Sequence, residues 1–204
     1  MDKYYVNFDN ATDRTWSMAV YQTLPNSIGL DSVAWKLTTV PKSGSSGVFW
    51  EVNYNVSLAA YRQDTPLGVY YASQTLDAHL GFEWDIVYKD GVQQLELVDA
   101  LDSTQADHIV INNKSGLEAN PGIGMSGMGS VFKRNVLSNA SAQFKVTPIY
   151  WVGLFRDVVI GEVISSNVEV GPFKLGFAEG SNVATITAIR QGDAIECSTA
   201  YSRR

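Results

Sequence analysis

Residues Gly47–Tyr61 read GVFWEVNYNVSLAAY, and apolar and polar side chains alternate along this stretch. Apolar residues occupy every second position from Val48 to Leu58, with Glu51 and three further polar residues between them. A period of two is typical of a β-strand that has one buried and one solvated face. Eleven residues at about 3.3 Å each predict a strand of roughly 36 Å. We expect a second sheet to cover its apolar face, which would otherwise remain in water.

Short strands separated by turn signals account for most of the remaining chain. Asp90-Gly91 lies between two strand-like segments and favours the type I′ turn of a β-hairpin, in which both central residues need positive φ. Pro25-Asn26-Ser27 is predicted to end the second strand, and Val158–Val170 to form a late one. Neither a helical apolar period nor an internal repeat is found. The sequence therefore predicts an all-β protein, a single-domain antiparallel β-sandwich of roughly a dozen strands spanning residues 1–204.

Composition favours a folded, acidic chain. The 204 residues are 45% hydrophobic and 18% charged, with a formal net charge of −6. This charge disfavours non-specific binding to nucleic acid or to anionic lipid. The N-terminus lacks the apolar core of a signal peptide, and no apolar run is long enough for a transmembrane segment. We expect a soluble protein that is cytoplasmic or exported without a cleavable signal peptide.

Two other features of the sequence have simple structural interpretations. Cys197 is the single cysteine, which excludes an internal disulfide and favours a buried, inert thiol. Four Asn-x-Ser/Thr sequences begin at Asn10, Asn55, Asn113 and Asn139. Because no export signal accompanies them, turn chemistry is preferred over glycosylation.

The glycines Gly122, Gly124, Gly127 and Gly129 are predicted to form a loop, and the first three match the letters of a dinucleotide-binding fingerprint. That motif needs a helix after the glycines and a βαβ unit around them. The residues after Gly129 have the pattern of a strand. We therefore interpret the four glycines as structural, permitting a bulge or close backbone packing, and predict no cofactor.

The sequence offers no diagnosed catalytic or metal site. His79 and His108 are the only histidines, and neither has the spacing of a zinc site or a hydrolase triad. Five carboxylates could instead supply an acid–base pair or a calcium site: Glu83, Asp85, Asp99, Asp102 and Asp107. Such groupings also arise by chance among twenty-one acidic residues, so we predict no metal and expect a protein that is not an enzyme.

Consecutive aromatic residues are the most informative candidates for ligand binding. Tyr70-Tyr71 and Tyr150-Trp151 each fall within a predicted strand, so one ring of each pair should point away from the core. An outward ring can stack on a sugar or lie at a lipid interface. It can equally be covered by a loop, a second layer or a partner subunit.

Six phrases occur along the chain in this order: Val20-Tyr21-Gln22-Thr23, Ala34-Trp35, Phe49-Trp50-Glu51-Val52-Asn53-Tyr54, Ala72-Ser73-Gln74, Gly122–Gly127 and Tyr150-Trp151. In these phrases and their order the chain resembles the RhiA family. None of them is a catalytic motif. The resemblance implies a bacterial protein of the rhizosphere, linked to quorum sensing and without an assigned reaction, so it identifies no functional residues.

Three classes of function are consistent with these observations. The first is a non-enzymatic β-sandwich that acts by binding or self-association, in the interaction of a bacterium with its host or neighbours. The second is a membrane-active toxin that binds lipid head groups, of the pore-forming type. The third is a carbohydrate-binding module or a carboxylate-based glycosidase. The partners considered are therefore a glycan, a lipid head group or a second copy of the chain, and no nucleic acid.

Overall fold

The alternating stretch at residues 47–61 forms two strands. The computed structural model describes residues 3–24 and 29–204, so the turn predicted at Pro25-Asn26-Ser27 lies outside the described residues. Strand β5 (Gly44–Glu51) ends in the middle of the stretch, and β6 (Tyr54–Arg62) then begins in a different sheet. The prediction of one continuous strand is therefore wrong.

Hydrogen bonds to Ser126 take the place of strand pairing at this break. Ser126 Oγ accepts from Glu51 N at 2.7 Å and donates to Glu51 O at 3.1 Å, and Ser126 N donates to Asn53 O at 3.1 Å. These bonds satisfy backbone groups that have left the sheet ladder. The apolar row on either side of the break contributes to two different cores. Trp50 packs in one core and Val56 packs in the other.

The strands of the described residues form four sheets. Sheet I contains, in order, β17 (Ala194–Ser202), β16 (Val183–Gln191), β1 (Lys3–Ala11) and β5. Sheet II contains β15 (Val170–Lys174), β14 (Ile149–Phe155), β2 (Trp16–Thr23) and β4 (Lys36–Val40). Sheet III contains β3 (Leu30–Ser32), β12 (Met128–Lys133), β11 (Asn120–Met125), β6 and β7 (Val69–Asp77). Sheet IV contains β13 (Ser141–Lys145), β10 (His108–Asn113), β8 (Phe82–Lys89) and β9 (Val92–Ala100).

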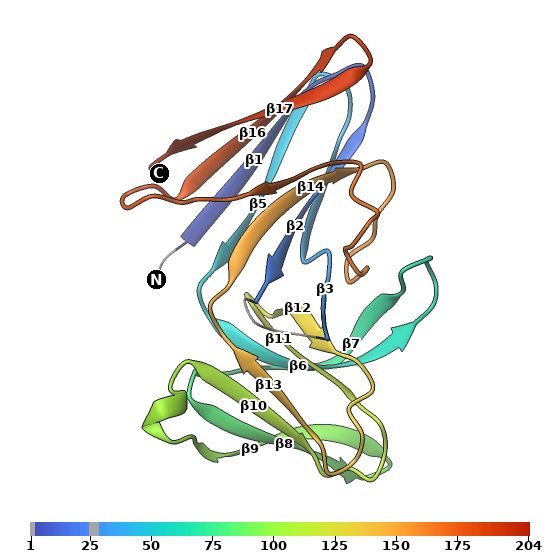
Figure 1. The fold of residues 1–204 in the computed structure, drawn as a ribbon, viewed down its shortest axis with the longest axis vertical. Helices are drawn as coiled ribbons and strands as arrows, with labels where there is room; N and C mark the ends of the chain where they lie inside the picture. Colours follow the sequence, from blue (N-terminus) through green and yellow to red (C-terminus); the bar gives the residue numbers. More distant parts are fainter. Residues whose placement is uncertain (1–2, 25–28) are drawn as a thin grey trace.

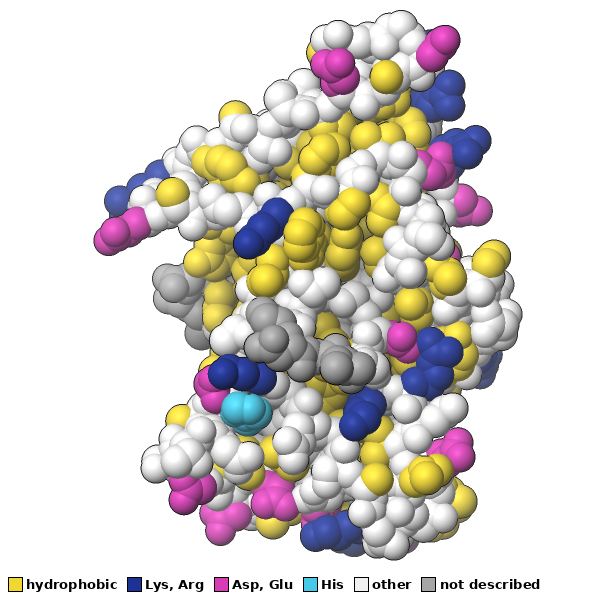
Figure 2. All heavy atoms as spheres, in the orientation of Figure 1, with side chains coloured by type: hydrophobic (Ala, Val, Ile, Leu, Met, Phe, Trp, Pro, Cys, Tyr) yellow, Lys and Arg dark blue, Asp and Glu magenta, His cyan; other side chains and the backbone are white. Residues whose placement is uncertain are grey.

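These sheets build two lobes along the long axis of the molecule (Figure 1). The upper lobe consists of sheets I and II, whose inner faces share a core that contains Phe8, Trp35 and Trp50. In Figure 2, hydrophobic side chains gather over the middle of this lobe, while most of the acidic and basic ones lie toward its edges. The lower lobe consists of sheets III and IV.

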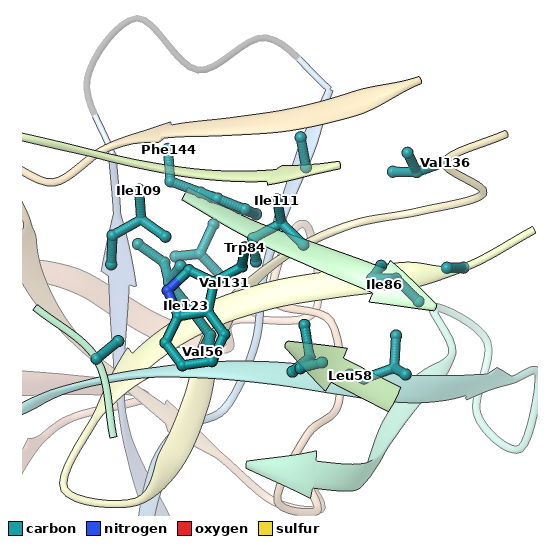
Figure 3. Close-up of a cluster of buried hydrophobic side chains, with 14 of the residues drawn as sticks. Val56, Leu58, Trp84, Ile86, Ile109, Ile111, Ile123, Val131, Val136 and Phe144 are labelled. Atoms are coloured by element: carbon teal, nitrogen blue, oxygen red, sulfur yellow. The ribbon is translucent and has the colours of Figure 1, made fainter. Parts of the chain in front are cut away.

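The core of the lower lobe is formed by side chains that point toward one another from its two sheets (Figure 3). Ile109 and Phe144 belong to sheet IV, and Val56 and Ile123 belong to sheet III. Trp84 lies between them and is almost fully buried. Each lobe is thus a pair of sheets around its own apolar interior.

The all-β class is confirmed, but a single sandwich of about a dozen strands is not. Two strand pairs are also parallel, β1 with β16 and β8 with β10, so the sheets are not purely antiparallel. The residues predicted as the strand Val158–Val170 make only isolated bridges before β15, and Gly161 has a φ of 83° there. Among the described residues, helical structure is limited to the 3₁₀ turn Ser103–Gln105, and no helix could span a membrane.

The two lobes repeat one strand plan that the sequence did not reveal. Sheet I has the order β17-β16-β1-β5, and sheet IV has the order β9-β8-β10-β13. Sheet II has the order β15-β14-β2-β4, which corresponds to β7-β6-β11-β12 in sheet III. Each half of the chain gives four of these strands to each lobe, so the halves are interleaved. A single domain over residues 1–204 stays a prediction, and this interleaving is consistent with it.

Two Asn-x-Ser/Thr sequences occupy equivalent places in this plan. Asn10 Nδ2 donates to Arg14 O at 2.8 Å and Val40 O at 3.0 Å, and Asn10 Oδ1 accepts from the Thr12 hydroxyl at 2.7 Å. Both asparagines, Asn10 and Asn113, are buried. The turn chemistry expected for these sequences is therefore present at Asn10.

Asn113 makes the same set of bonds in the lower lobe. Its Nδ2 donates to Leu117 O at 2.6 Å and Val136 O at 2.8 Å, and its Oδ1 accepts from the Ser115 hydroxyl at 2.7 Å. Each asparagine thus joins the end of a strand in one sheet to the loop that leads into the facing sheet. A buried carboxamide in this role leaves several backbone groups without partners when it is removed.

We expect Asn113→Ala to lower the free energy of unfolding by about 2–4 kcal/mol, because it orphans buried carbonyl groups. Urea unfolding followed by tryptophan fluorescence measures this loss. Asn7→Ala is the matched control, since Asn7 is exposed and makes one long hydrogen bond of 3.4 Å. A loss below about 0.5 kcal/mol for Asn113→Ala, as expected for Asn7→Ala, would contradict the structural role.

Candidate functional site

A hollow of about 590 Å³ lies where the two lobes meet. Its volume falls in the range of small-molecule binding sites. Strand β2 of the upper lobe contributes to it, together with β3 and the β6–β7 connection of the lower lobe. We call this hollow the junction pocket. Its lining residues include Tyr21, Thr23, Asp31, Tyr61, Gln63 and Arg134.

An ion pair with a tyrosine partner fixes the polar side of the junction pocket. Arg134 donates to Asp31 Oδ2 through Nη2 at 2.6 Å and through Nε at 3.1 Å. The Tyr70 hydroxyl donates to the same oxygen at 2.5 Å. The side chains of Asp31 and Arg134 remain about a quarter to a third exposed, at 24% and 35%. Their charged groups are therefore held in place and remain within reach of a ligand.

Aromatic packing holds this network against the lower lobe. The Arg134 guanidinium lies over the Tyr61 ring, with 3.8 Å between its central carbon and the ring centroid. Tyr70 stacks on Phe132 with a centroid distance of 4.5 Å and an interplanar angle of 9°. Planar guanidinium groups favour such stacking, and it restricts the rotamers of Arg134.

The pKa shifts around the pocket indicate the charge states of Tyr21, Tyr70 and Arg134 at neutral pH. Burial raises the pKa of Tyr21 to about 12. Burial and then the hydrogen bond to Asp31 raise the pKa of Tyr70. Burial alone would lower the pKa of Arg134, but its bonds to Tyr70 and Asp31 outweigh this and raise it. At neutral pH, Tyr21 and Tyr70 are therefore neutral phenols and Arg134 keeps its positive charge.

The structure separates the four predicted aromatic candidates. Tyr70 is buried behind the junction pocket, and Tyr71 is 42% exposed on the other face of β7. Tyr150 packs beside Trp50 in the upper core with a centroid distance of 5.0 Å. Trp151 Nε1 donates to the hydroxyl of Thr23, a pocket-lining residue, at 2.9 Å.

Two of these four residues therefore support the junction pocket from behind. Tyr70 does so through Asp31, and Trp151 does so through Thr23. The four do not form one concave aromatic surface. Their role as ligand-binding residues stays a prediction, and the structure gives Tyr70 and Trp151 a positioning role.

The glycine-rich segment forms a hairpin, where the sequence predicted a loop. Gly122 and Gly124 lie in β11, and Gly129 lies in β12, with Ser126 and Gly127 at the turn and both at positive φ. The ladder has a register shift at Gly124, where a Cβ atom would collide with the Met128 carbonyl. Both the bulge and the close packing predicted for these glycines are present. A strand comes after them, which does not fit the dinucleotide motif.

The acidic residues singled out in the sequence lie apart from the junction pocket. Glu83 and Asp85 both accept hydrogen bonds from Asn112 on sheet IV, and Lys114 pairs with Asp85 at 2.7 Å. Asp107 bonds to His108 at 2.7 Å. Asp102 accepts from Thr104 N at 2.9 Å and caps the 3₁₀ turn. Each of these four carboxylates already has a structural partner. Within the described residues, no cluster of three or more metal-ligating side chains is found.

Two other hollows have different chemistry. One of about 790 Å³ is lined by Lys3, Tyr4, Tyr5, Phe177 and neighbouring residues near both chain ends. Another of about 440 Å³ is mainly apolar and includes Trp35 and Phe49. Neither contains a hydrogen-bonded ion pair comparable to Asp31 and Arg134 among the described residues. We therefore take the junction pocket as the candidate site.

Sequence reasoning missed Asp31 and Arg134, which are 103 residues apart. Neither residue belongs to a motif, and surface aspartates and arginines are common. The one local signal was Arg134 beside Lys133, which is too short to indicate a basic patch. Their pairing depends on β3 and β12 being neighbours in sheet III.

We expect the buried tyrosines to control stability at alkaline pH. A folded pKa that is raised above the unfolded value of about 10 contributes stability below pH 10, and this stability is lost as the pH rises through the folded pKa. Tyr21, Tyr70 and Tyr150 all have raised pKa values. Their ionisation, followed by absorbance at alkaline pH, should coincide with unfolding detected by circular dichroism. Full ionisation of all ten tyrosines near pH 10 in the folded protein would contradict this.

Comparison with known proteins agrees with the resemblance noted in the sequence. Protein RhiA of Rhizobium leguminosarum bv. viciae is 28% identical over 171 residues, which cover 80% of this chain and 72% of that protein. No solved structure matches the chain. The RhiA family model matches residues 1–195, nearly the whole chain. The chain therefore belongs to the RhiA family.

Proposed function

We propose that this protein is a non-enzymatic binding protein whose junction pocket takes a neutral, polyhydroxylated ligand such as a glycan. The single observation that carries the proposal is the Asp31–Arg134 pair, whose partly exposed groups are fixed within the pocket. A carboxylate and a guanidinium held side by side can accept from and donate to neighbouring hydroxyl groups. Because their charges compensate, they favour neutral ligands over ions.

The remaining lining supports a ligand with both polar and apolar faces. Ser32, Gln63 and Ser165 offer short polar side chains, while Leu67 and Val163 supply apolar surface. Binding sites for small molecules commonly combine apolar walls with a few placed polar groups. Sugars have both hydroxyl edges and apolar faces, so they suit this combination.

The absence of an enzymatic role is also part of the proposal. A glycosidase needs two carboxyl groups facing each other, about 5–10 Å apart. Among the described residues that line the junction pocket, Asp31 is the single carboxylate, and it is held by Tyr70 and Arg134. The arrangement supports recognition more than acid–base catalysis. We place this recognition in the interaction of a bacterium with its host or neighbours, the setting that the family resemblance implies. Self-association stays a hypothesis, which light scattering tests directly.

A glycan array probed with the full chain, followed by calorimetry on a glycan that binds, tests the proposal. We expect Arg134→Ala to weaken binding about tenfold or more, because a hydrogen bond to a charged group is lost. Arg14→Ala is the matched control, since Arg14 is exposed in the loop between β1 and β2 and does not line the junction pocket. It should bind like the unmodified chain.

Arg134 also contributes to packing, so a second variant separates recognition from folding. Asp31→Asn keeps the size of the side chain but removes its charge, and it should also weaken glycan binding while the circular dichroism spectrum is unchanged. A blank array, or hydrolysis of an oligosaccharide by the unmodified chain, would overturn the proposal.

A further inference from the structure

The lower lobe ends in a cluster of exposed apolar side chains, which we call the lower tip. It consists of Tyr88, Val92, Leu117 and Leu137, each between 51% and 59% exposed. Tyr88 and Val92 flank the β8–β9 turn, and Leu117 and Leu137 lie in the loops after β10 and before β13. Tyr88, Val92 and Leu117 line a common hollow with Gly91. The hollow at the lower tip shares no lining residue with the junction pocket, so binding there is separate from the proposed function.

Hydrogen bonds join the three segments of the lower tip into one body. Gln93 Nε2 donates to Ser115 Oγ at 2.7 Å and to Glu118 O at 3.1 Å, which ties the hairpin to the loop that carries Leu117. Gly116 N donates to Ser138 Oγ at 3.1 Å, which ties that loop to the one that carries Leu137. The apolar side chains are therefore presented together by a fixed framework.

The upper lobe provides an internal comparison for this cluster. Arg14 O accepts from Asn10 as Leu117 O accepts from Asn113, so Arg14 is equivalent to Leu117. Gly44 N donates to Pro41 O as Ala140 N donates to Leu137 O, so Pro41 is equivalent to Leu137.

The β16–β17 hairpin completes the equivalence. The pair Gln191 and Ala194 corresponds to Lys89 and Val92, which places Arg190 at the position of Tyr88. The resulting upper tip, Arg14, Pro41, Arg190 and Ala194, is exposed, and Arg190 forms ion pairs with Asp13 and Asp193. The same backbone framework thus carries two arginines, a proline and an alanine at one end of the molecule and four large apolar residues at the other. The apolar residues of the lower tip are therefore not required by the loop geometry.

The two tips lie at opposite ends of the long axis (Figure 1), and Figure 2 shows acidic and basic side chains near both ends, so the contrast lies in the tip residues themselves. The side chains of the lower tip project from turns, so they can enter the interface of a lipid bilayer without the strands entering it. Leucine and valine favour the edge of the acyl region, and tyrosine favours the boundary with water.

The lysines next to the lower tip already have acidic partners. Lys89 pairs with Glu96 and Lys114 pairs with Asp85, while the acidic residues Asp90 and Glu118 are exposed beside them. The outer cation of a zwitterionic head group complements these exposed carboxylates. An anionic surface would be opposed by the overall charge of −6.

We propose that the lower tip docks the protein onto the interface of a zwitterionic phospholipid bilayer. Leu117 and Leu137 enter the acyl boundary, Tyr88 lies among the head groups, and the charged residues around the tip remain in the polar layer. The attachment is peripheral, because only side chains at the ends of turns reach the apolar region.

Sedimentation of the full chain with phosphatidylcholine vesicles tests this docking. We expect the unmodified chain to bind, and the double variant Leu117→Arg, Leu137→Pro to bind at least about tenfold more weakly. This variant transplants the residues of the upper tip into the same backbone framework, so its thermal unfolding should stay close to that of the unmodified chain. Leu97→Arg is the matched control, because Leu97 is 55% exposed on β9 of the same lobe, away from the turn, and this variant should keep full binding.

Any of three results would overturn the proposal. The first is that the unmodified chain does not sediment with the vesicles, and the second is that Leu97→Arg loses binding as strongly as the double variant. The third is that light scattering without lipid finds an oligomer for the unmodified chain and a monomer for the double variant, which would assign the tip to a contact between copies. As a second readout, Leu117→Asp should reduce vesicle binding while leaving glycan binding at the junction pocket unchanged.

Discussion

The fold depends on a backbone crossing between two sandwiches at residues 51–53. A chain that leaves one sheet and enters another must satisfy its amide and carbonyl groups without a neighbouring strand. Ser126 supplies these partners through Glu51 and Asn53. The turn that contains Ser126 belongs to the β11–β12 hairpin of the lower lobe, so the crossing also fixes how that hairpin meets the upper lobe. The apolar row on either side of the crossing contributes to both cores, which couples their packing.

The repeated strand plan explains where binding surfaces arise. Interleaved halves bring β2 of one lobe beside β3 and β6 of the other, and the junction pocket forms where these strands meet. The plan also duplicates the buried asparagine and its loops at the two far ends. The two ends share a hydrogen-bonded framework but carry different exposed residues, Arg14 at one end and Leu117 at the other, so the framework does not fix the surface chemistry.

Local patterns predicted local structure well. Asp90-Gly91 indicated a hairpin, and both residues have positive φ at the β8–β9 turn. The glycines near residue 124 indicated a bulge, which is present because a Cβ atom there would meet backbone. The pair Tyr70-Tyr71 indicated one inward and one outward ring, as observed. The break at residues 51–53 could not be predicted, because the alternation of apolar residues persists through it and the groups that stabilise it are distant in sequence.

The sequence by itself determined the all-β class, several turns and the apolar rows that become the cores, because these depend on a period of two and on the φ requirements of a few residues. Only the tertiary structure decided that there are two lobes, that each half of the chain contributes strands to both of them, and that Asp31 meets Arg134. These features depend on contacts between residues that are far apart in sequence, and on which sheet a strand joins after it crosses. Alternation indicated which apolar side chains enter a core, but it did not specify the partner against which they pack, and it did not reveal that the polar residues Asn55 and Ser57 on the opposite face are also buried.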